Sequence, residues 1–308
     1  MARMGYQLLS YQSKQGPRAA LKIDEQFWDA QQLSGEAEYS SVLRILDDWA
    51  RADELFSRIV SSADPPPAKP LSSVSVLAPI LYPGQIFAAG ANYQDHIDEM
   101  HLTEFRAENA KKAGGRPWFF SKTSRSAIIG TGSMRALPSY SSKVDWEIEL
   151  AVVIGRTASR VKARDALAYV AGYTIANDLS ARDFVARESV EPDSPFRFDW
   201  VSHKGFDGAL PIGPWITPAR FIPEPQALDL KLWVDDELMQ NSNTRHMVFS
   251  IAEQIEELSA RVTLNPGDLI LTGTPSGVGM TRGTFLRPGQ QLRLAIEHIG
   301  ELRHGFSE

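Results

Sequence analysis

The sequence predicts an α+β protein, and two periodic patterns and one break in composition support this. Residues 143–154 alternate apolar and acidic side chains before an apolar stretch, which is typical of a β-strand. Between residues 41 and 60, apolar residues recur at helical spacing after a serine that suits a helix N-cap. Residues 61–70 contain four prolines, which favour a stiff connector. We therefore expect a small N-terminal αβ domain at residues 1–70 and a second domain at residues 71–308.

The remaining elements follow from the same patterns and from Gly and Pro positions. A hairpin is expected over residues 6–10 and 19–23, with its turn at Gly16-Pro17. Further strands are expected at residues 85–89, 118–120, 173–178, 228–238, 269–271 and 290–297. Helices are expected at residues 94–109, 162–170, 180–188 and 248–258. Residues 203–207 are expected to form a loop that leads into a strand at 211–216.

Composition and charge exclude several classes of protein. With 43% hydrophobic and 23% charged residues, the 308-residue chain resembles an ordinary globular protein with a sizeable core. The formal net charge of −6, without a basic cluster, argues against a nucleic-acid partner. The lack of cysteine excludes disulfides and thiolate chemistry. No apolar run reaches membrane-spanning or signal-peptide length, so we expect no membrane partner and a cytoplasmic location.

Acidic residues gather on one face of the strand at residues 143–154. Asp145, Glu147 and Glu149 alternate with apolar residues, so a regular strand would point all three to one side. The strand at residues 173–178 ends on a fourth acid, Asp178. Crowded carboxylates repel one another, and an oxygen-preferring divalent cation such as Mg²⁺ would offset that repulsion. The alternative is a solvated acidic face on an exposed strand.

Three other features suit chemistry, and each also has a simpler structural explanation. His96 and Glu99 share one face of the helix at residues 94–109, either as a general base and its partner or as an ordinary surface pair. Lys204 precedes a glycine and an aromatic residue, so it either enters a pocket or stays exposed. The glycine-rich loop at residues 272–279 suits close approach of an anion or is a plain tight turn. It lacks a P-loop or dinucleotide fingerprint, so no nucleotide is implied.

Together these motifs resemble the fumarylacetoacetate hydrolase family, in its acylpyruvase-like branch of 2-oxo acid hydrolases. The matching stretches occur in the family's order between about residues 80 and 300. They are Gly90-Ala91-Asn92-Tyr93 with His96 and Glu99, then residues 145–150, 177–183, 204–207 and 273–279. One departure concerns Val185, which stands about where many relatives place a glutamine, so one substrate contact is expected to differ.

The resemblance implies a mainly β catalytic domain with helices, a rolled mixed β-sandwich, usually found as a homodimer. It assigns Glu147, Glu149 and Asp178 to a Mg²⁺ or Mn²⁺ ion, with Asp145 outside the ligand set. In the same way, it implies the remaining roles: His96 and Glu99 as a dyad on a lid, Lys204 as a pocket cation, and Lys122, Arg182 and Thr274 as contacts to a substrate carboxylate.

Three functions remain open at this point. The first is hydrolysis of a carbon–carbon bond in a β-diketo acid, such as an acylpyruvate or fumarylpyruvate, with water activated by the His–Glu dyad. The second uses the same metal site to decarboxylate or tautomerise a 2-oxo acid, or to hydrolyse a 2,4-diketo-3-deoxy sugar acid. The third is a 2-oxo acid binding protein without turnover. The dyad favours hydrolysis, because decarboxylation needs no activated water.

Overall fold

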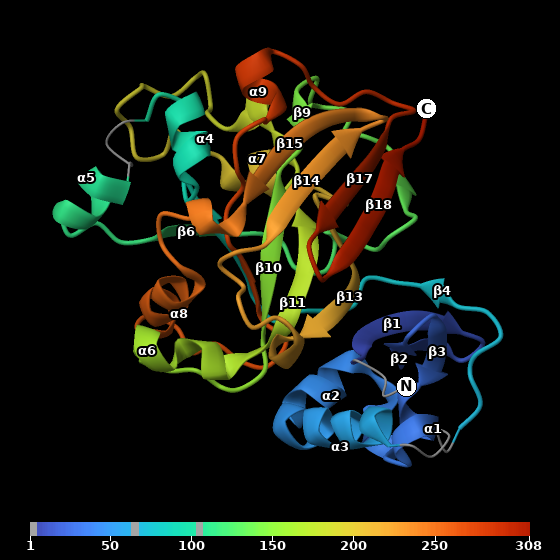
Figure 1. The fold of residues 1–308 in the computed structure, drawn as a ribbon. Helices are drawn as coiled ribbons and strands as arrows, with labels where there is room; N and C mark the ends of the chain where they lie inside the picture. Colours follow the sequence, from blue (N-terminus) through green and yellow to red (C-terminus); the bar gives the residue numbers. More distant parts are fainter. Residues whose placement is uncertain (1–4, 63–67, 103–106) are drawn as a thin grey trace.

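The computed structural model describes residues 5–62, 68–102 and 107–308, and it confirms the expected mainly β fold with helices (Figure 1). In these residues the strands form sheets of eleven, five and two strands. The two larger sheets bury most of the apolar side chains. Within the described ranges, no helix is long and apolar enough to cross a membrane.

The N-terminal unit combines a three-stranded meander with short helices. Strands β1 (Gln7–Ser13), β2 (Gly16–Ile23) and β3 (Gln26–Asp29) pair antiparallel, which confirms the expected hairpin. Helix α1 (Ala30–Ser34) follows, and the helix expected at residues 41–60 is divided into α2 (Val42–Asp47) and α3 (Trp49–Ser61). The division falls at Asp48, whose backbone leaves the helical region (φ −115°, ψ 31°). Ser41 caps α2 by accepting a hydrogen bond from the Arg44 amide.

The largest sheet continues from the N-terminal unit into the rest of the molecule. Strand β1 pairs with β13 (Leu210–Pro218), where Leu8 lies opposite Ile216. The sheet then runs through β11 (Val170–Asn177), β10 (Ile148–Ile154), β16 (Leu269–Leu271), β5 (Ile86–Gly90) and β6 (Trp118–Ser121). Two short strands, β4 (Ser75–Val76) and β7 (Ile128–Ile129), pair with β1 and β13. The division at residues 61–70 therefore stays a prediction, and residues 63–67 of the connector lie outside the described ranges.

The five-stranded sheet packs against strands β10 and β11. Its strands, in order, are β15 (Glu237–Asn243), β14 (Asp229–Val234), β17 (Gln291–Ile296), β18 (Gly300–Phe306) and β8 (Met134–Arg135) (Figure 1). Leu150 of β10 lies in one buried apolar cluster with Leu230, Leu294 and Leu302 of this sheet. Helix α8 (Ile251–Ser259) starts with a capping box, confirming the helix expected near residues 248–258, and contacts α6 (Ala163–Ala166).

Four local expectations were wrong, all near the segments that carry the predicted site. The strand expected at residues 143–154 is interrupted between β9 (Val144–Asp145) and β10, where the Asp145 side chain accepts the Trp146 amide proton that a ladder would use. Residues 180–188 form no helix beyond one 3₁₀ turn, because β12 (Ser180–Ala181) pairs with β9. The loop expected at residues 203–207 begins inside helix α7 (Trp200–Lys204).

The fourth correction concerns the helix expected at residues 94–109. Helix α4 (Gln94–Glu99) ends after one and a half turns, since His101 adopts a left-handed backbone (φ 58°). Helix α5 (Ala107–Lys112) is separate, and residues 103–106 of the expected helix lie outside the described ranges. A short helix α9 (Gly279–Arg282) follows the glycine-rich loop.

The contact between β1 and β13 predicts that the N-terminal unit stabilises the whole sheet. Leu8 is fully buried where these strands meet, so Leu8→Ala should lower the free energy of unfolding by about 2–5 kcal/mol, as core leucine truncations do. Urea denaturation followed by circular dichroism measures this change. Leu238→Ala, at a side chain that is 43% exposed, is the matched control and should change it little. A decrease in the free energy of unfolding below about 1 kcal/mol for Leu8→Ala would contradict the prediction that this contact stabilises the sheet.

Candidate active site

The pairing of β10 with β11 brings three carboxylates together. Ile148 lies opposite Asn177 in the antiparallel register, so Glu147 and Asp178 meet just beyond the paired ends, where the Asp178 amide donates to the Glu147 carbonyl at 2.9 Å. Glu149 lies two residues further along the chain on β10. One carboxylate oxygen from each of the three lies within 4.8 Å of the others, and all three side chains are buried. The solvated acidic face is thereby excluded.

Two of these carboxylates are paired with buried cations. The Lys204 ammonium donates to Glu147 and to Asp178, both at 2.7 Å. Lys122 donates to the other oxygen of Asp178 at 2.5 Å, and Arg182 donates to the other oxygen of Glu147 at 2.5 Å. The predicted cations Lys122, Arg182 and Lys204 thus all reach the carboxylate group.

The pKa shifts follow from this pairing. Burial raises the pKa of Glu147, but the charges of Lys204 and Arg182 outweigh it and lower that pKa to about 2. Burial lowers the pKa of Lys204, yet Asp178 and Glu147 together raise it above its usual value. Lys122 differs, because burial and the nearby Lys204 charge prevail over Asp178 and lower its pKa. Glu147 and Lys204 are therefore held as an ion pair.

Glu149 is the carboxylate that lacks a cationic partner in the described part of the chain. It accepts one hydrogen bond, from the Gly273 amide at 2.6 Å. Burial, then repulsion from Asp178 and Glu147, raises the pKa of Glu149 well above its usual value. A buried carboxylate in this setting needs either a proton or a further cation. Three converging carboxylates are the all-oxygen donor set that Mg²⁺ and Mn²⁺ prefer, so these residues fit a divalent metal ion.

Asp145 has a different role from the other three acids. It accepts hydrogen bonds from the Gly279 amide at 2.6 Å, the Met280 amide at 3.0 Å and the Arg182 guanidinium at 2.9 Å. The regular strand that was expected to carry Asp145 with Glu147 and Glu149 is interrupted after Asp145, although Asp145 and Glu147 contact the same Arg182 guanidinium. Asp145 instead joins the start of α9 to β9 and orients Arg182.

The His96–Glu99 pair lies on α4. Their Nδ1 and Oε2 atoms are 3.5 Å apart, longer than a well-formed hydrogen bond, and His96 Nδ1 has no hydrogen-bond partner among the described residues. Glu99 also accepts from the Gly277 amide at 3.0 Å and the Thr281 hydroxyl at 2.8 Å. Burial raises the pKa of Glu99, but His96, Thr281 and Gly277 together lower it. Glu99 thus anchors α4 to the glycine-rich loop, and the role of the pair as a dyad stays a prediction.

The glycine-rich loop also supports the carboxylates from behind. Gly273 bonds to Glu149, and the Thr274 hydroxyl donates to the Ile148 carbonyl at 2.9 Å. Because that hydroxyl proton is already engaged, a substrate carboxylate would have to displace this bond to reach it. The predicted substrate contact of Thr274 remains a prediction.

Sequence reasoning missed residues that hold the broken strand in place. The Asn177 side chain accepts from the Glu147 amide at 2.8 Å and lies 2.9 Å from His304 Nε2. The Gln240 side chain accepts from the Ile148 amide at 2.9 Å and donates to the Thr274 hydroxyl. Asn177 belongs to the stretch 177–183 that resembles the family, so the sequence carries a signal for this residue. Gln240 and His304 are remote in sequence and carry no comparable signal.

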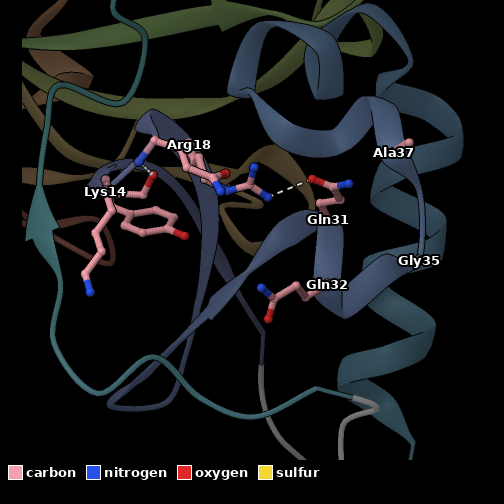
Figure 2. Close-up of a pocket in the computed structure, with 9 residues that line it drawn as sticks. Lys14, Arg18, Gln31, Gln32, Gly35 and Ala37 are labelled. Atoms are coloured by element: carbon pink, nitrogen blue, oxygen red, sulfur yellow. Dashed lines mark hydrogen bonds between the residues drawn. The ribbon is translucent and has the colours of Figure 1, made fainter.

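A hollow lies in the N-terminal unit, which carries none of the predicted site residues. Its volume is about 620 Å³, and Lys14, Arg18, Gln31 and Gln32 line it (Figure 2). The Arg18 guanidinium donates to the buried Asp29 at 2.7 Å and to Gln31 at 2.7 Å. Because the charge of Arg18 is already paired with Asp29, this guanidinium is less available to a ligand than the groups of the carboxylate site.

Comparisons with known proteins show which family the chain is similar to. Residues 85–307 match the family model described as fumarylacetoacetate (FAA) hydrolase C-terminal. The mitochondrial oxaloacetate tautomerase Fahd2a of Rattus norvegicus is 40% identical over 236 residues, 76% of this chain and 70% of that protein. Maleylpyruvate hydrolase from Sphingobium sp. SYK-6, solved with manganese(II) and pyruvate, is 29% identical with a TM-score of 0.72, over 98% of this chain and 100% of that one. Fumarylacetoacetate hydrolase from Exiguobacterium antarcticum is 27% identical with a TM-score of 0.78, over 98% and 99%.

The isolation of Glu149 predicts strong dependence of metal affinity on its charge. Glu149→Gln keeps an oxygen for the Gly273 amide but removes the negative charge. Mn²⁺ affinity, measured by titration calorimetry, should fall by at least about 100-fold, since even partners of metal ligands contribute roughly 10–100-fold. Glu188→Gln, at an exposed surface position, should leave it unchanged. Unaltered Mn²⁺ affinity in Glu149→Gln would exclude this residue from the metal site.

Burial of His304 predicts a loss of stability in acid. Burial lowers the pKa of His304 to about 3, so the folded protein keeps this ring neutral. The unfolded chain takes up the proton near pH 6.5, so the stabilising contribution is full above that pH and is lost progressively as the pH falls towards 3. Denaturation of the metal-free protein at pH 7.5 and about 4.5 should show a smaller pH effect in His304→Gln than in the wild type. The exposed His298→Gln should match the wild type, and equal slopes for all three would contradict the assignment.

Proposed function

Because the chain belongs to the fumarylacetoacetate hydrolase family, we propose that it is a divalent-metal-dependent enzyme that acts on 2-oxo acids. Its proposed reaction is the interconversion of the keto and enol forms of a 2-oxo dicarboxylate such as oxaloacetate. The observation that carries this proposal is the buried group of Glu147, Glu149 and Asp178 with cations around it. Mg²⁺ and Mn²⁺ both suit these ligands.

The charges of the site favour an acidic substrate. Four buried carboxylates, Asp145 included, face the cations Lys122, Arg182 and Lys204 in the described part of the chain. A divalent cation would change this excess of one negative charge into an excess of one positive charge. An anionic 2-oxo acid would then be attracted to the site.

The same arrangement suits a reaction that builds negative charge on oxygen. When bound, the metal ion would polarise the 2-oxo group as a Lewis acid. Lys204 and Arg182, fixed by their carboxylate partners, would add a preorganised positive field. Because these groups are buried and already oriented, little reorganisation accompanies the charge change.

His96 is the residue proposed to move the proton. In ketonisation the enol hydroxyl loses one proton and carbon 3 gains one, so atoms balance without a second reactant. The His96 ring, 13% exposed on α4, would deliver or remove the proton at carbon 3, with Glu99 orienting the ring. Tautomerisation needs no activated water and no departing carbon group, and relatives named oxaloacetate tautomerases share 39–41% identity with this chain.

Hydrolysis of a carbon–carbon bond in an acylpyruvate is the second candidate. The His96–Glu99 pair suits activation of water, and the maleylpyruvate hydrolase neighbour was solved with pyruvate. Decarboxylation of a 2-oxo acid and cleavage of a diketo sugar acid would use the same positive electrostatic field.

The homodimer and the cytoplasmic location also stay predictions, and several relatives are named as mitochondrial proteins.

The proposal predicts rapid ketonisation that depends on His96. With Mg²⁺ or Mn²⁺ present, the wild type should accelerate the loss of the ultraviolet absorbance of enol-oxaloacetate. His96→Gln should slow it by about 10²–10⁴-fold, the usual contribution of proton transfer by a side chain. The exposed His298→Gln is the matched control and should keep the wild-type rate.

The same protein is then incubated with acetylpyruvate, and pyruvate and acetate are measured. Release of both products at a rate well above that of ketonisation would replace the tautomerase proposal with the hydrolase. Ketonisation without product release supports the tautomerase. Failure in both assays would reject the two candidates together.

A further inference from the structure

His203 is a buried histidine that the proposed reaction does not use. It lies in α7, directly before Lys204, and only 3% of its surface is exposed. Among the described residues, neither ring nitrogen has a hydrogen-bond partner. Buried polar atoms are rarely left unpaired, so this imidazole is available to a water molecule or a ligand from outside the protein chain.

An aromatic stack fixes the orientation of the His203 ring. The ring stacks on Trp200, with centroids 5.6 Å apart and an interplanar angle of 26°. Trp200 stacks in turn on Phe120 at 5.0 Å, and the Lys204 ammonium lies 5.4 Å from the Phe120 ring. The same stack therefore supports both His203 and the cation that contacts the carboxylates.

The charges that act on His203 all belong to the carboxylate site. Burial, followed by Lys204, Arg182 and Lys122, lowers the pKa of His203 to about 2 against the opposing effect of Asp178. The ring is thus neutral, with one N–H donor and one acceptor nitrogen. Lys204, Arg182 and Lys122 contribute positive charge around the ring, and with a divalent cation at the carboxylates the site would carry the excess positive charge that favours an anion.

We propose that His203 is a specificity-determining residue that donates a hydrogen bond to the distal carboxylate of a 2-oxo dicarboxylate. This inference rests on the proposed function, and it specifies which part of the substrate is recognised and where. The 2-oxo acid end would lie at the divalent cation that Glu147, Glu149 and Asp178 would hold, and the second carboxylate would lie on the α7 side of the site. A 2-oxo acid without a second acceptor loses this contact.

Packing alone does not require a histidine at this position. A phenylalanine would preserve the stack on Trp200 and would leave no unpaired nitrogen in the interior. His203→Phe therefore removes the proposed hydrogen bond and retains the ring, while His203→Gln retains a donor and removes the ring.

The test uses the Mn²⁺-loaded protein and two measurements on each variant. The first is KM for ketonisation of enol-oxaloacetate, which has the distal carboxylate. The second is Ki for oxalate, which occupies the 2-oxo acid end and has no distal group. In His203→Phe, KM should rise about 10-fold or more, the range for a hydrogen bond to a charged group, while Ki stays within about twofold of wild type. His203→Gln should restore most of the KM.

A purely structural role gives a different result. If KM and Ki rise together in His203→Phe, the ring supports packing and the proposal is overturned. If neither changes, the nitrogens make no substrate contact and the proposal is overturned as well. Should His203→Phe fail to fold, His203→Leu replaces it with the same expectations. A wild type that binds oxalate but does not ketonise enol-oxaloacetate rejects the proposed function itself, which separates the two failures.

Discussion

The arrangement of this protein depends on keeping several carboxylates charged in its interior. Burying one such group without compensation costs several kcal/mol, and placing three within 4.8 Å of one another adds their repulsion. Lys204, Lys122 and Arg182 offset most of this cost through contacts of 2.5–2.7 Å. In the described part of the chain Glu149 has no cationic partner, and this asymmetry suits a metal ion better than a closed set of ion pairs would.

The backbone around the carboxylates is irregular because the site requires it. In a continuous strand, backbone amides of residues 146–148 would donate hydrogen bonds to a neighbouring strand. Instead, side chains accept them: Asp145 takes the amide of Trp146, Asn177 that of Glu147, and Gln240 that of Ile148. These three backbone amides are thereby satisfied while the Glu147 carboxylate contacts Lys204. The interruption is thus stabilised from three different parts of the chain.

The same charged centre is compatible with several reactions of 2-oxo acids, because each of them develops negative charge on the same oxygen. Selection among them must come from residues around the centre. On the proposals above, His96 would move the proton and His203 would contact the distal end of the substrate. Variation at such positions can change the substrate without changing the metal ligands.

The sequence alone determined the fold class, the hairpin, most strands and the acids that converge, because period-two alternation and short motifs are local signals. It also indicated Lys204 from the glycine and aromatic residue that follow it, and Lys122 and Arg182 only through resemblance to a family. The break after Asp145, the short α7 and the supports from Gln240 and His304 emerged only in the tertiary structure. The supports from Gln240 and His304 depend on partners distant in sequence, such as Gln240 with Ile148, 92 residues away. A pattern within one segment cannot report which remote side chain will take its amide proton, and that pairing is what shapes the site.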